Sequence, residues 1–307
     1  MNLKIRIGYT PGIRSLPSGS QLKQLVKIGD KYNYDSIWLS DHVLGEHPLL
    51  EPTVALSLIA AYSTKLKFGT SVLALPLRNP IILAKQLATL DYLSNGRLLP
   101  AFGLGQNDPI QYKACGIDMK TRGNRANESI QLIRRLWTEP RVTHHGTFFS
   151  LDNVSLLPKP SQKPAPPIWI GGRSRAAQRR TGIVGDGWLT SQTTPTEIKA
   201  GIKFISSVAR SHNRIIDPNH IGAIMGFYIS ENPRIHLTPE WANIQTRRDV
   251  SAMEYTAIGT TEEIAKKIES FVKAGASKFI MRPLGPSEES ADQLSLFGEE
   301  ILPIFHK

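Results

Sequence analysis

Hydrophobic and polar positions follow two different periods along this chain. Short, continuously apolar or β-branched stretches alternate with longer stretches in which apolar residues recur every three to four positions. The first pattern predicts eight strands, at Lys4–Tyr9, Ser36–Asp41, Leu66–Ala74, Leu98–Gly105, Pro167–Gly172, Gly187–Gln192, Ile221–Ser230 and Lys278–Leu284. Continuous apolar runs of this kind are typical of parallel strands that are covered on both faces.

The second pattern predicts helices in most of the gaps, and two of these helices carry clear end signals. Asn79 is a good N-cap and is followed by Pro80 at the first helical position. Thr260 and Glu263 have the spacing of a capping box. Further helices are expected at Leu22–Lys31, Arg122–Thr138, Arg175–Val184, Thr196–Ser211 and after Pro286.

Strands that alternate with helices in this way predict an α/β fold, a (β/α)8 TIM barrel in a single domain that covers residues 1–307. An open, doubly wound sheet is the alternative. The glycines of "GLGQND" (Gly103 to Asp108) support it poorly, because a third glycine is missing and the motif follows the fourth strand rather than the first.

Two segments interrupt the alternation. About 141–167 contains a probable hairpin and a proline-rich connector, and about 231–259 is a long polar stretch. Loops of this length within a compact domain often act as lids or binding loops. We therefore expect both segments to be insertions at the C-terminal face of the barrel.

Composition narrows the classes of function. The 307 residues are 40% hydrophobic and 21% charged, as expected of a soluble globular protein. No apolar run approaches the ~20 residues of a membrane span, and the first residues show no signal-peptide core. Cys115 is the single cysteine, which excludes an intrachain disulfide and favours a cytoplasmic location. No membrane partner and no metal site are expected.

The chain carries an excess of basic residues. Thirty-seven Lys and Arg against 26 Asp and Glu give a formal net charge of +11. Such an excess can indicate nucleic-acid binding, but here the basic residues are spread along the chain without a basic tail. We expect no nucleic-acid partner. The densest basic stretch, "GGRSRAAQRR" at 171–180, is better explained by a small anionic ligand.

Candidate chemistry lies at the predicted strand ends, which converge on one face of a barrel. Asp41 and His42 end the second strand, and a histidine can exchange a proton near neutral pH. Ser71 and Val72, with small neighbours in the third strand, would let the backbone approach a flat ligand. The pair Asp41-His42 alone could equally cap the following loop.

Two further strand ends offer binding groups. Gly105 keeps the surface low after the fourth strand, and the amide of Gln106 can donate and accept hydrogen bonds. After the fifth strand, Gly171, Gly172 and Arg173 lead into a helix, where free N–H groups and a guanidinium would suit a phosphate.

The residues quoted so far carry a resemblance to a known family. "YDSIWLSDH", "SVLALPLRNPIILAKQLATLDYLSNGRLLPAFGLG", "GNRANESIQLIRRLWTE" with "PPIWIGG", and "GDGWL" follow one another as in the luciferase-like flavin-dependent oxidoreductases. The resemblance covers nearly the whole chain. It implies a (β/α)8 barrel that holds FMN or the deazaflavin coenzyme F420 at its mouth, and the Asp-His ending looks like that of the F420-dependent members.

The resemblance also implies roles for single residues. Asp41 would lie beside the ring system and His42 would face the reacting carbon. Ser71-Val72 would match the family's non-prolyl cis peptide, which supports the ring from behind. Gln106 departs from the pattern, since related sugar-phosphate dehydrogenases carry an acid there, and this departure puts that substrate class in doubt.

The leading hypothesis is hydride transfer between F420 and a small organic substrate beneath the 231–259 segment. An FMN-dependent monooxygenase that uses reduced flavin and oxygen is the alternative enzyme. The third hypothesis is a flavin-binding barrel that catalyses no reaction, and the fourth is RNA binding by the basic surface. The family resemblance favours a homodimer.

Overall fold

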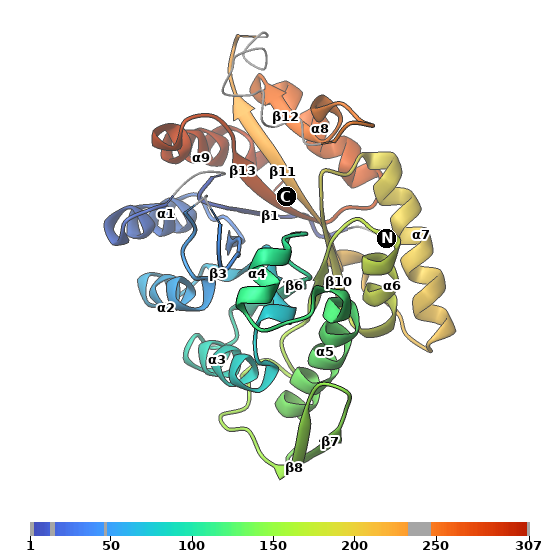
Figure 1. The fold of residues 1–307 in the computed structure, drawn as a ribbon. Coiled ribbons are helices and arrows are strands. Elements are labelled where there is room, and N and C mark those ends of the chain that lie inside the picture. Colours follow the sequence, from blue (N-terminus) through green and yellow to red (C-terminus); the bar gives the residue numbers. More distant parts are fainter. Residues whose placement is uncertain (1–2, 13–15, 46–47, 233–246, 306–307) are drawn as a thin grey trace.

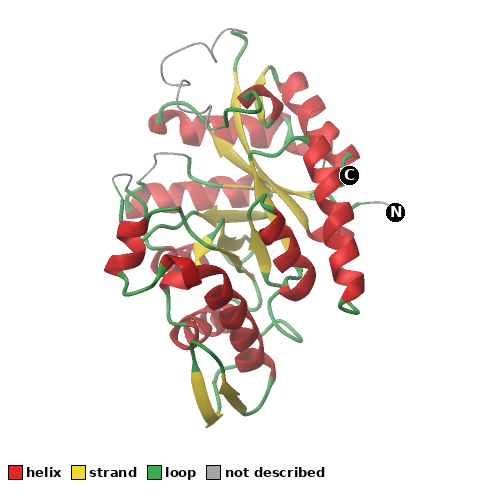
Figure 2. Ribbon diagram, turned by 45° about the vertical axis from the view of Figure 1, so that its right-hand side comes forward, coloured by secondary structure: helices red, strands yellow, loops and turns green. Residues whose placement is uncertain are grey.

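Parallel strands form the centre of the molecule, and helices surround them (Figures 1 and 2). The computed structural model describes residues 3–12, 16–45, 48–232 and 247–305. The parallel strands are β1 Arg6–Tyr9, β2 Ser36–Leu39, β3 Lys67–Thr70, β4 Leu73–Ala74, β5 Leu98–Leu99, β6 Ala101–Gly103, β9 Trp169–Gly171, β10 Gly187–Ser191, β11 Ile221–Ile229, β12 Thr256–Gly259 and β13 Lys278–Pro283.

The strands close into a ring. β3 and β4 belong to one passage of the chain, interrupted at Ser71-Val72, and β5 and β6 belong to the next passage, interrupted at Pro100. β3 pairs with β5, and β4 pairs with β6, which pairs with β9. From β9 the order continues through β10, β11, β13, β1 and β2 back to β3. The predicted barrel of eight strand passages is therefore confirmed.

Helices cover the outside of the ring (Figure 2). They are α1 Gly19–Lys31, α2 Pro52–Tyr62, α3 Pro80–Leu93, α4 Pro109–Ala114, α5 Arg122–Thr138, α6 Arg175–Val184, α7 Pro195–Ser211, α8 Thr261–Lys273, α9 Ser290–Glu300 and α10 Leu302–Phe305. The predicted end signals are confirmed. Asn79 accepts from the N–H groups of Ile81 and Ile82, and Thr260 and Glu263 form a complete capping box. In the described part of the chain, no helix is both long and apolar enough to cross a membrane.

The first insertion lies elsewhere than expected. The predicted hairpin is present as β7 Val142–His145 and β8 Ser150–Val154, which pair antiparallel. The hairpin follows the C-terminal end of α5 and precedes the start of β9. Because the helices of a β/α unit run opposite to its strands, this position is the N-terminal rim of the barrel. Both views place the hairpin beyond α5, away from the strand ends that carry the candidate residues.

The second insertion, expected as a polar loop over 231–259, ends in a strand. β12 pairs in parallel with the far half of β11, from Gly226 opposite Thr256 to Ile229 opposite Gly259. The near half of β11 pairs with β13 inside the barrel. β11 is therefore the long strand that projects beyond the ring in Figure 1. Residues 233–246 of this insertion lie outside the described residues.

The inside of the barrel is closed by apolar side chains. A compact cluster fills it, formed by Trp38, Leu99, Ala101, Trp169, Leu189 and Ile280. A larger apolar layer lies between the strands and the helices. A filled barrel leaves only its rims for ligands. At the N-terminal rim, Lys278 is buried and pairs with Asp35, so the other rim is the place for a site.

Candidate active site

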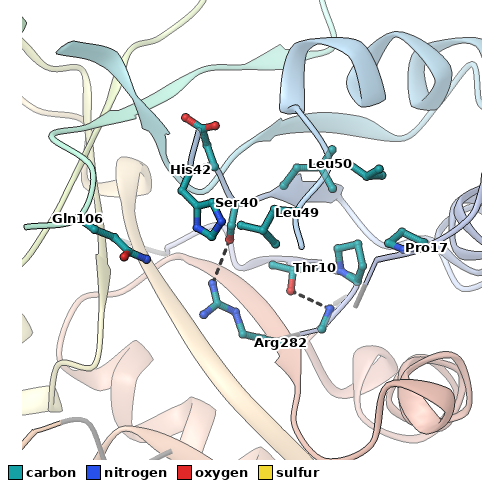
Figure 3. Close-up of a pocket in the computed structure, with 12 residues that line it drawn as sticks. Thr10, Pro17, Ser40, His42, Leu49, Leu50, Gln106 and Arg282 are labelled. Carbon is teal, nitrogen blue, oxygen red and sulfur yellow. Dashed lines mark hydrogen bonds between the residues drawn. The ribbon is translucent and has the colours of Figure 1, made fainter. Parts of the chain in front are cut away.

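A cavity of about 230 Å³ opens among the C-terminal ends of the strands. It is lined by Thr10, Pro11, Gly12, Pro17, Leu39, Ser40, Asp41, His42, Leu49, Leu50, Gln106 and Arg282. Three of the predicted site residues, Asp41, His42 and Gln106, are therefore brought together. Figure 3 shows the ring of His42, the amide of Gln106 and the guanidinium of Arg282 directed into one space.

The carboxylate of Asp41 is fully engaged. One oxygen accepts from the backbone N–H of Ala74 at 2.8 Å and from Arg78 Nη1 at 2.7 Å, and the other accepts from Arg78 Nη2 at 2.8 Å. The side chain of Asp41 is 1% exposed. A bidentate pair of this kind fixes orientation as well as charge. Asp41 thus ties the end of the second strand passage to the end of the third.

His42 is held in the cavity wall by its neighbours in the chain. Gln111 of α4 accepts from the N–H of Val43 at 2.6 Å and from that of Leu44 at 3.3 Å. A Cβ atom added to Gly45 would lie 2.9 Å from His42 Nε2. The chain therefore turns tightly over the ring, and only a glycine leaves room for it.

Arg282 belongs to the cavity but was not among the predicted site residues. It lies near the end of β13 and donates from Nη2 to Ser40 Oγ at 3.5 Å. Burial lowers the pKa of its guanidinium below the ordinary value. A lone arginine in the apolar run "KFIMRPL" was the available signal, because charged residues are seldom placed inside a strand without a partner or a role.

The interruption of the third strand passage forms a bulge next to the cavity, where the carbonyl of Ser71 lies 3.5 Å from Oγ of Ser40, although Ser71 and Val72 do not line the cavity themselves. The peptide bond between Ser71 and Val72 is cis, as the resemblance implied. The side chain of Val72 packs against two glycines, since a Cβ atom would lie 2.4 Å from Val72 Cγ2 at Gly103 and 2.5 Å from Val72 Cγ1 at Gly171. Ser71 Oγ is buried without a hydrogen-bond partner among the described residues. A flat ligand with polar edges would suit a bulge that carries an unsatisfied hydroxyl.

The bulge also reaches the strand end after β6. Gly105 has a φ of +77°, which favours glycine, and a Cβ atom there would be 3.1 Å from the methyl group of Ala74. Ala74 is the residue whose N–H binds Asp41. Asp41, Val72, Gly105 and Gly171 are thus linked through direct contacts at one rim of the barrel.

The predicted anion site lies at the start of α6. Gly172 has a φ of +118°, and Ser174 caps the helix by accepting from the N–H of Ala177. Arg173 lines a separate depression of about 390 Å³ with Arg175, Gln178, Arg247 and others. The N-terminal turn of α6 and Arg173 together provide a positive region beyond the bulge.

Two basic residues of the 171–180 stretch contact neighbouring helices. Arg180 turns inward, and its Nε donates to Asn127 Oδ1 at 2.6 Å. Arg175 packs its guanidinium over the ring of Phe204, 4.3 Å from the ring centre. The guanidinium of Arg180 is therefore directed towards α5 rather than towards the start of α6.

The comparisons with known proteins agree with this architecture. Residues 3–234 match the family described as luciferase-like monooxygenase. An F420-dependent glucose-6-phosphate dehydrogenase of Kineococcus radiotolerans is 24% identical over 335 residues, which cover 98% of this chain and 97% of that relative.

Two solved structures show the same fold. The monooxygenase RslO1 of Streptomyces bottropensis superposes with a TM-score of 0.83 at 22% identity, over 98% of this chain and 100% of that one. An F420-dependent secondary alcohol dehydrogenase, solved in complex with an F420-acetone adduct, has a TM-score of 0.81 at 21% identity, over 99% and 100% of the two chains.

Proposed function

The chain belongs to the luciferase-like monooxygenase family, and on that premise we propose that it is an oxidoreductase that exchanges a hydride between coenzyme F420 and a small organic substrate. One observation carries the proposal. A histidine held in a small cavity stands at the same rim as a cis-peptide bulge, whose buried Ser71 hydroxyl has no partner among the described residues. The full-length relative that is named F420-dependent supports this coenzyme over FMN.

The bound coenzyme would supply the hydride chemistry, and the protein would supply binding, orientation and electrostatics. Val72 and Ser71 would support the ring from behind, with Gly105 and Gln106 at its edge. Gly171, Gly172 and Arg173 would hold the phosphate.

His42 would hold or deliver the proton at a substrate oxygen. It faces the cavity, and an imidazole can both donate and accept a proton. Asp41 would act as a positioning residue at the edge of the ring. Its oxygens are already bound by Ala74 and Arg78, so it would keep the His42 loop in place rather than bind through its charge.

Glucose 6-phosphate is not the proposed substrate, although the relative named above acts on it. Gln106 stands where the resemblance leads us to expect an acid in such dehydrogenases. An amide cannot donate a proton as a carboxylic acid can. The cavity of about 230 Å³ would also be shared with the edge of the coenzyme ring, because Asp41 and Gln106 lie in its wall, and the space left favours a small substrate.

The coenzyme proposal has a direct test. Oxidised F420 and FMN are each titrated into the purified protein, and binding is followed by fluorescence. We expect F420 to bind at least ~10-fold more tightly than FMN, a difference of ~1.4 kcal/mol. Tight binding of FMN with no response to F420 would instead favour the monooxygenase. Oxygen consumption with reduced FMN and a substrate would then establish it.

We also propose that the protein is a cytoplasmic homodimer. The single cysteine fits a reducing compartment. Several large apolar side chains of α2 and α3 are exposed, namely Val54, Leu58, Ile82, Tyr92 and Leu93. Three of them, Val54, Leu58 and Leu93, line a hollow of about 800 Å³ between the two helices. An exposed apolar face of this kind is typical of a subunit interface.

A further inference from the structure

Arg282 lies in the column of β13 residues that faces the barrel interior. Alternate residues of a strand point to the same side. Lys278 lies at the lower end of this column, with its ammonium 5.5 Å from the ring centre of Trp38. Ile280 packs in the interior cluster. Arg282 is therefore the uppermost member, and its guanidinium enters the cavity from below (Figure 3).

The charge of Arg282 has no carboxylate partner within the described ranges. Its contact there is Ser40 Oγ at 3.5 Å, a distance at the long limit of a hydrogen bond. Arg78, at the same rim, differs because it binds the carboxylates of both Asp41 and Glu51. A partly buried cation without a counter-ion is costly, and such groups persist mainly where a ligand supplies the missing charge.

The remainder of the cavity wall is mostly apolar. It includes Leu39, Leu49, Leu50, Pro11 and Pro17. The polar lining residues include Thr10 and Asp41, and four others, Arg282, Ser40, His42 and Gln106, meet on one side of the cavity (Figure 3). A ligand that satisfies both parts must carry a compact negative group and a short apolar body.

We propose that the substrate is a small organic acid whose carboxylate pairs with Arg282 and whose apolar part lies against the leucines. The inference rests on the proposed function and deepens it by naming the substrate class. The planar fork of a guanidinium matches a carboxylate with two parallel hydrogen bonds. With its carboxylate held there, the rest of a small acid extends towards His42, where the proton would be exchanged.

The test compares an acid with its uncharged isostere, and it needs no turnover. Butyrate and butyramide are titrated into the full-length protein by isothermal calorimetry, with and without F420. We expect the wild-type protein to bind butyrate at least ~10-fold more tightly than butyramide. Arg282→Gln should abolish this preference, and Arg282→Lys should retain only part of it. Arg210→Gln, at an exposed position of α7, is the matched control and should leave it unchanged.

Several results would overturn the inference. The wild-type protein could bind the two compounds equally or bind neither, or Arg282→Gln could keep the preference for butyrate. Arg282→Gln could also weaken F420 and leave butyrate unaffected, which would assign the guanidinium to the coenzyme. If Arg282→Gln does not fold, Arg282→Lys decides the matter. Failure of F420 to bind the wild-type protein would refute the coenzyme proposal but not a butyrate preference measured without coenzyme.

Discussion

Two glycines determine where Val72 lies, because any side chain in their place would occupy the space of its methyl groups. Gly103 and Gly171 belong to neighbouring strands, and Val72 fills the gap between them. The contact connects residues that are about a hundred positions apart in the sequence. The sequence predicted a low surface after the fourth strand and a phosphate site after the fifth, but the side chain that lies between the two strands depends on the closure of the barrel.

Gly171→Ala should therefore displace the bulge. The new methyl group would lie 2.5 Å from Val72 Cγ1, and overpacking of this kind costs ~1–3 kcal/mol. We expect a lower free energy of unfolding in urea and at least ~10-fold weaker coenzyme binding, because the support of the ring moves.

Adding Val72→Ala to Gly171→Ala should restore part of the stability, since it removes the methyl groups that clash. Gly19→Ala is the matched control, because nothing lies within 4 Å of a Cβ atom at Gly19. Strictly additive effects of the two substitutions would show that the two side chains do not interact, contrary to this prediction.

His42→Ala should separate catalysis from binding. Loss of a general acid or base usually lowers turnover by ~10²–10⁴-fold. Coenzyme affinity should change much less, because the bulge and the residues proposed to hold the phosphate lie elsewhere at the rim. His145→Ala, in the exposed half of the hairpin, serves as the control. A variant that loses affinity but turns over normally once saturated would remove His42 from the chemistry.

The site could be predicted from sequence only where its signals are local. Asp41, His42 and Gln106 were found because they follow apolar strands directly, and all three line the cavity. Arg78 was missed because its role depends on Asp41, a residue 37 positions earlier. Arg282 was missed because its direction is set by the register of β13 in the closed ring.

At the scale of elements, one carboxylate of α5 binds the turn of the hairpin, in addition to the contacts that Arg125 and Arg135 of the same helix make with the hairpin. Glu128 accepts from the N–H groups of Thr147 and Phe148 at 3.1 Å and of Phe149 at 2.9 Å, and it contacts His144 Nε2 at 3.1 Å. Burial alone would raise the pKa of Glu128, but the hydrogen bonds from His144 and the backbone lower it below the ordinary value.

Because the pKa of Glu128 is lowered in the folded protein, its contribution to stability is lost at low pH. A carboxylate with a lowered pKa in the folded state contributes its full stabilisation above its unfolded pKa of ~4.3, and the contribution is lost as the pH falls through the folded value. Glu128→Gln should therefore accelerate hydrogen exchange of the 147–149 amides at pH 7 by ~10–100-fold relative to core amides, as expected for hydrogen bonds to a charged group.

The wild-type protein should lose the same protection only as the pH falls below the ordinary pKa range of a glutamate, because the pKa of Glu128 is lowered in the folded protein. Glu139→Gln, an exposed partner of Arg135 at the end of the same helix, is the control and should leave the turn protected. Unchanged exchange in Glu128→Gln would mean that the turn is held by its own backbone.

Helices and strands were predicted best where a helix-capping residue or a regular hydrophobic period marks them in the sequence. α5 and α6 have the expected bounds, and α3 and α8 begin at the expected caps. α2 gave no amphipathic signal, because its sequence "PTVALSLIAAY" is apolar on nearly every side. β12 was missed because its four residues, "TAIG", are few and end a long polar segment.

At the scale of the whole molecule, eight alternating units were enough to predict the ring. The position of the hairpin was wrong because closeness to a strand end was taken to mean the C-terminal rim. The segment connects the end of α5 with the start of β9, and that connection always lies on the opposite rim. Direction along the barrel, rather than distance in sequence, decides which loops can reach the site.

The apolar character of α2 also bears on assembly. A helix that is apolar on all sides is stable at a surface only if something covers its outer face. On α2 and the neighbouring α3, Leu58 is 43% and Leu93 is 73% exposed. In light scattering coupled to gel filtration, we expect a mass of twice the 34.0 kDa chain.

Leu93→Glu should convert the protein to monomers, because two copies of a buried charge would face each other across a two-fold interface. Ile215→Glu is the matched control, since Ile215 is 90% exposed and lies far along the chain, between α7 and β11. It should leave the dimer intact. A monomeric wild-type protein at tens of micromolar, or a Leu93→Glu variant that remains dimeric, would show that this face is not the interface. In the second case, another surface must hold the two copies together.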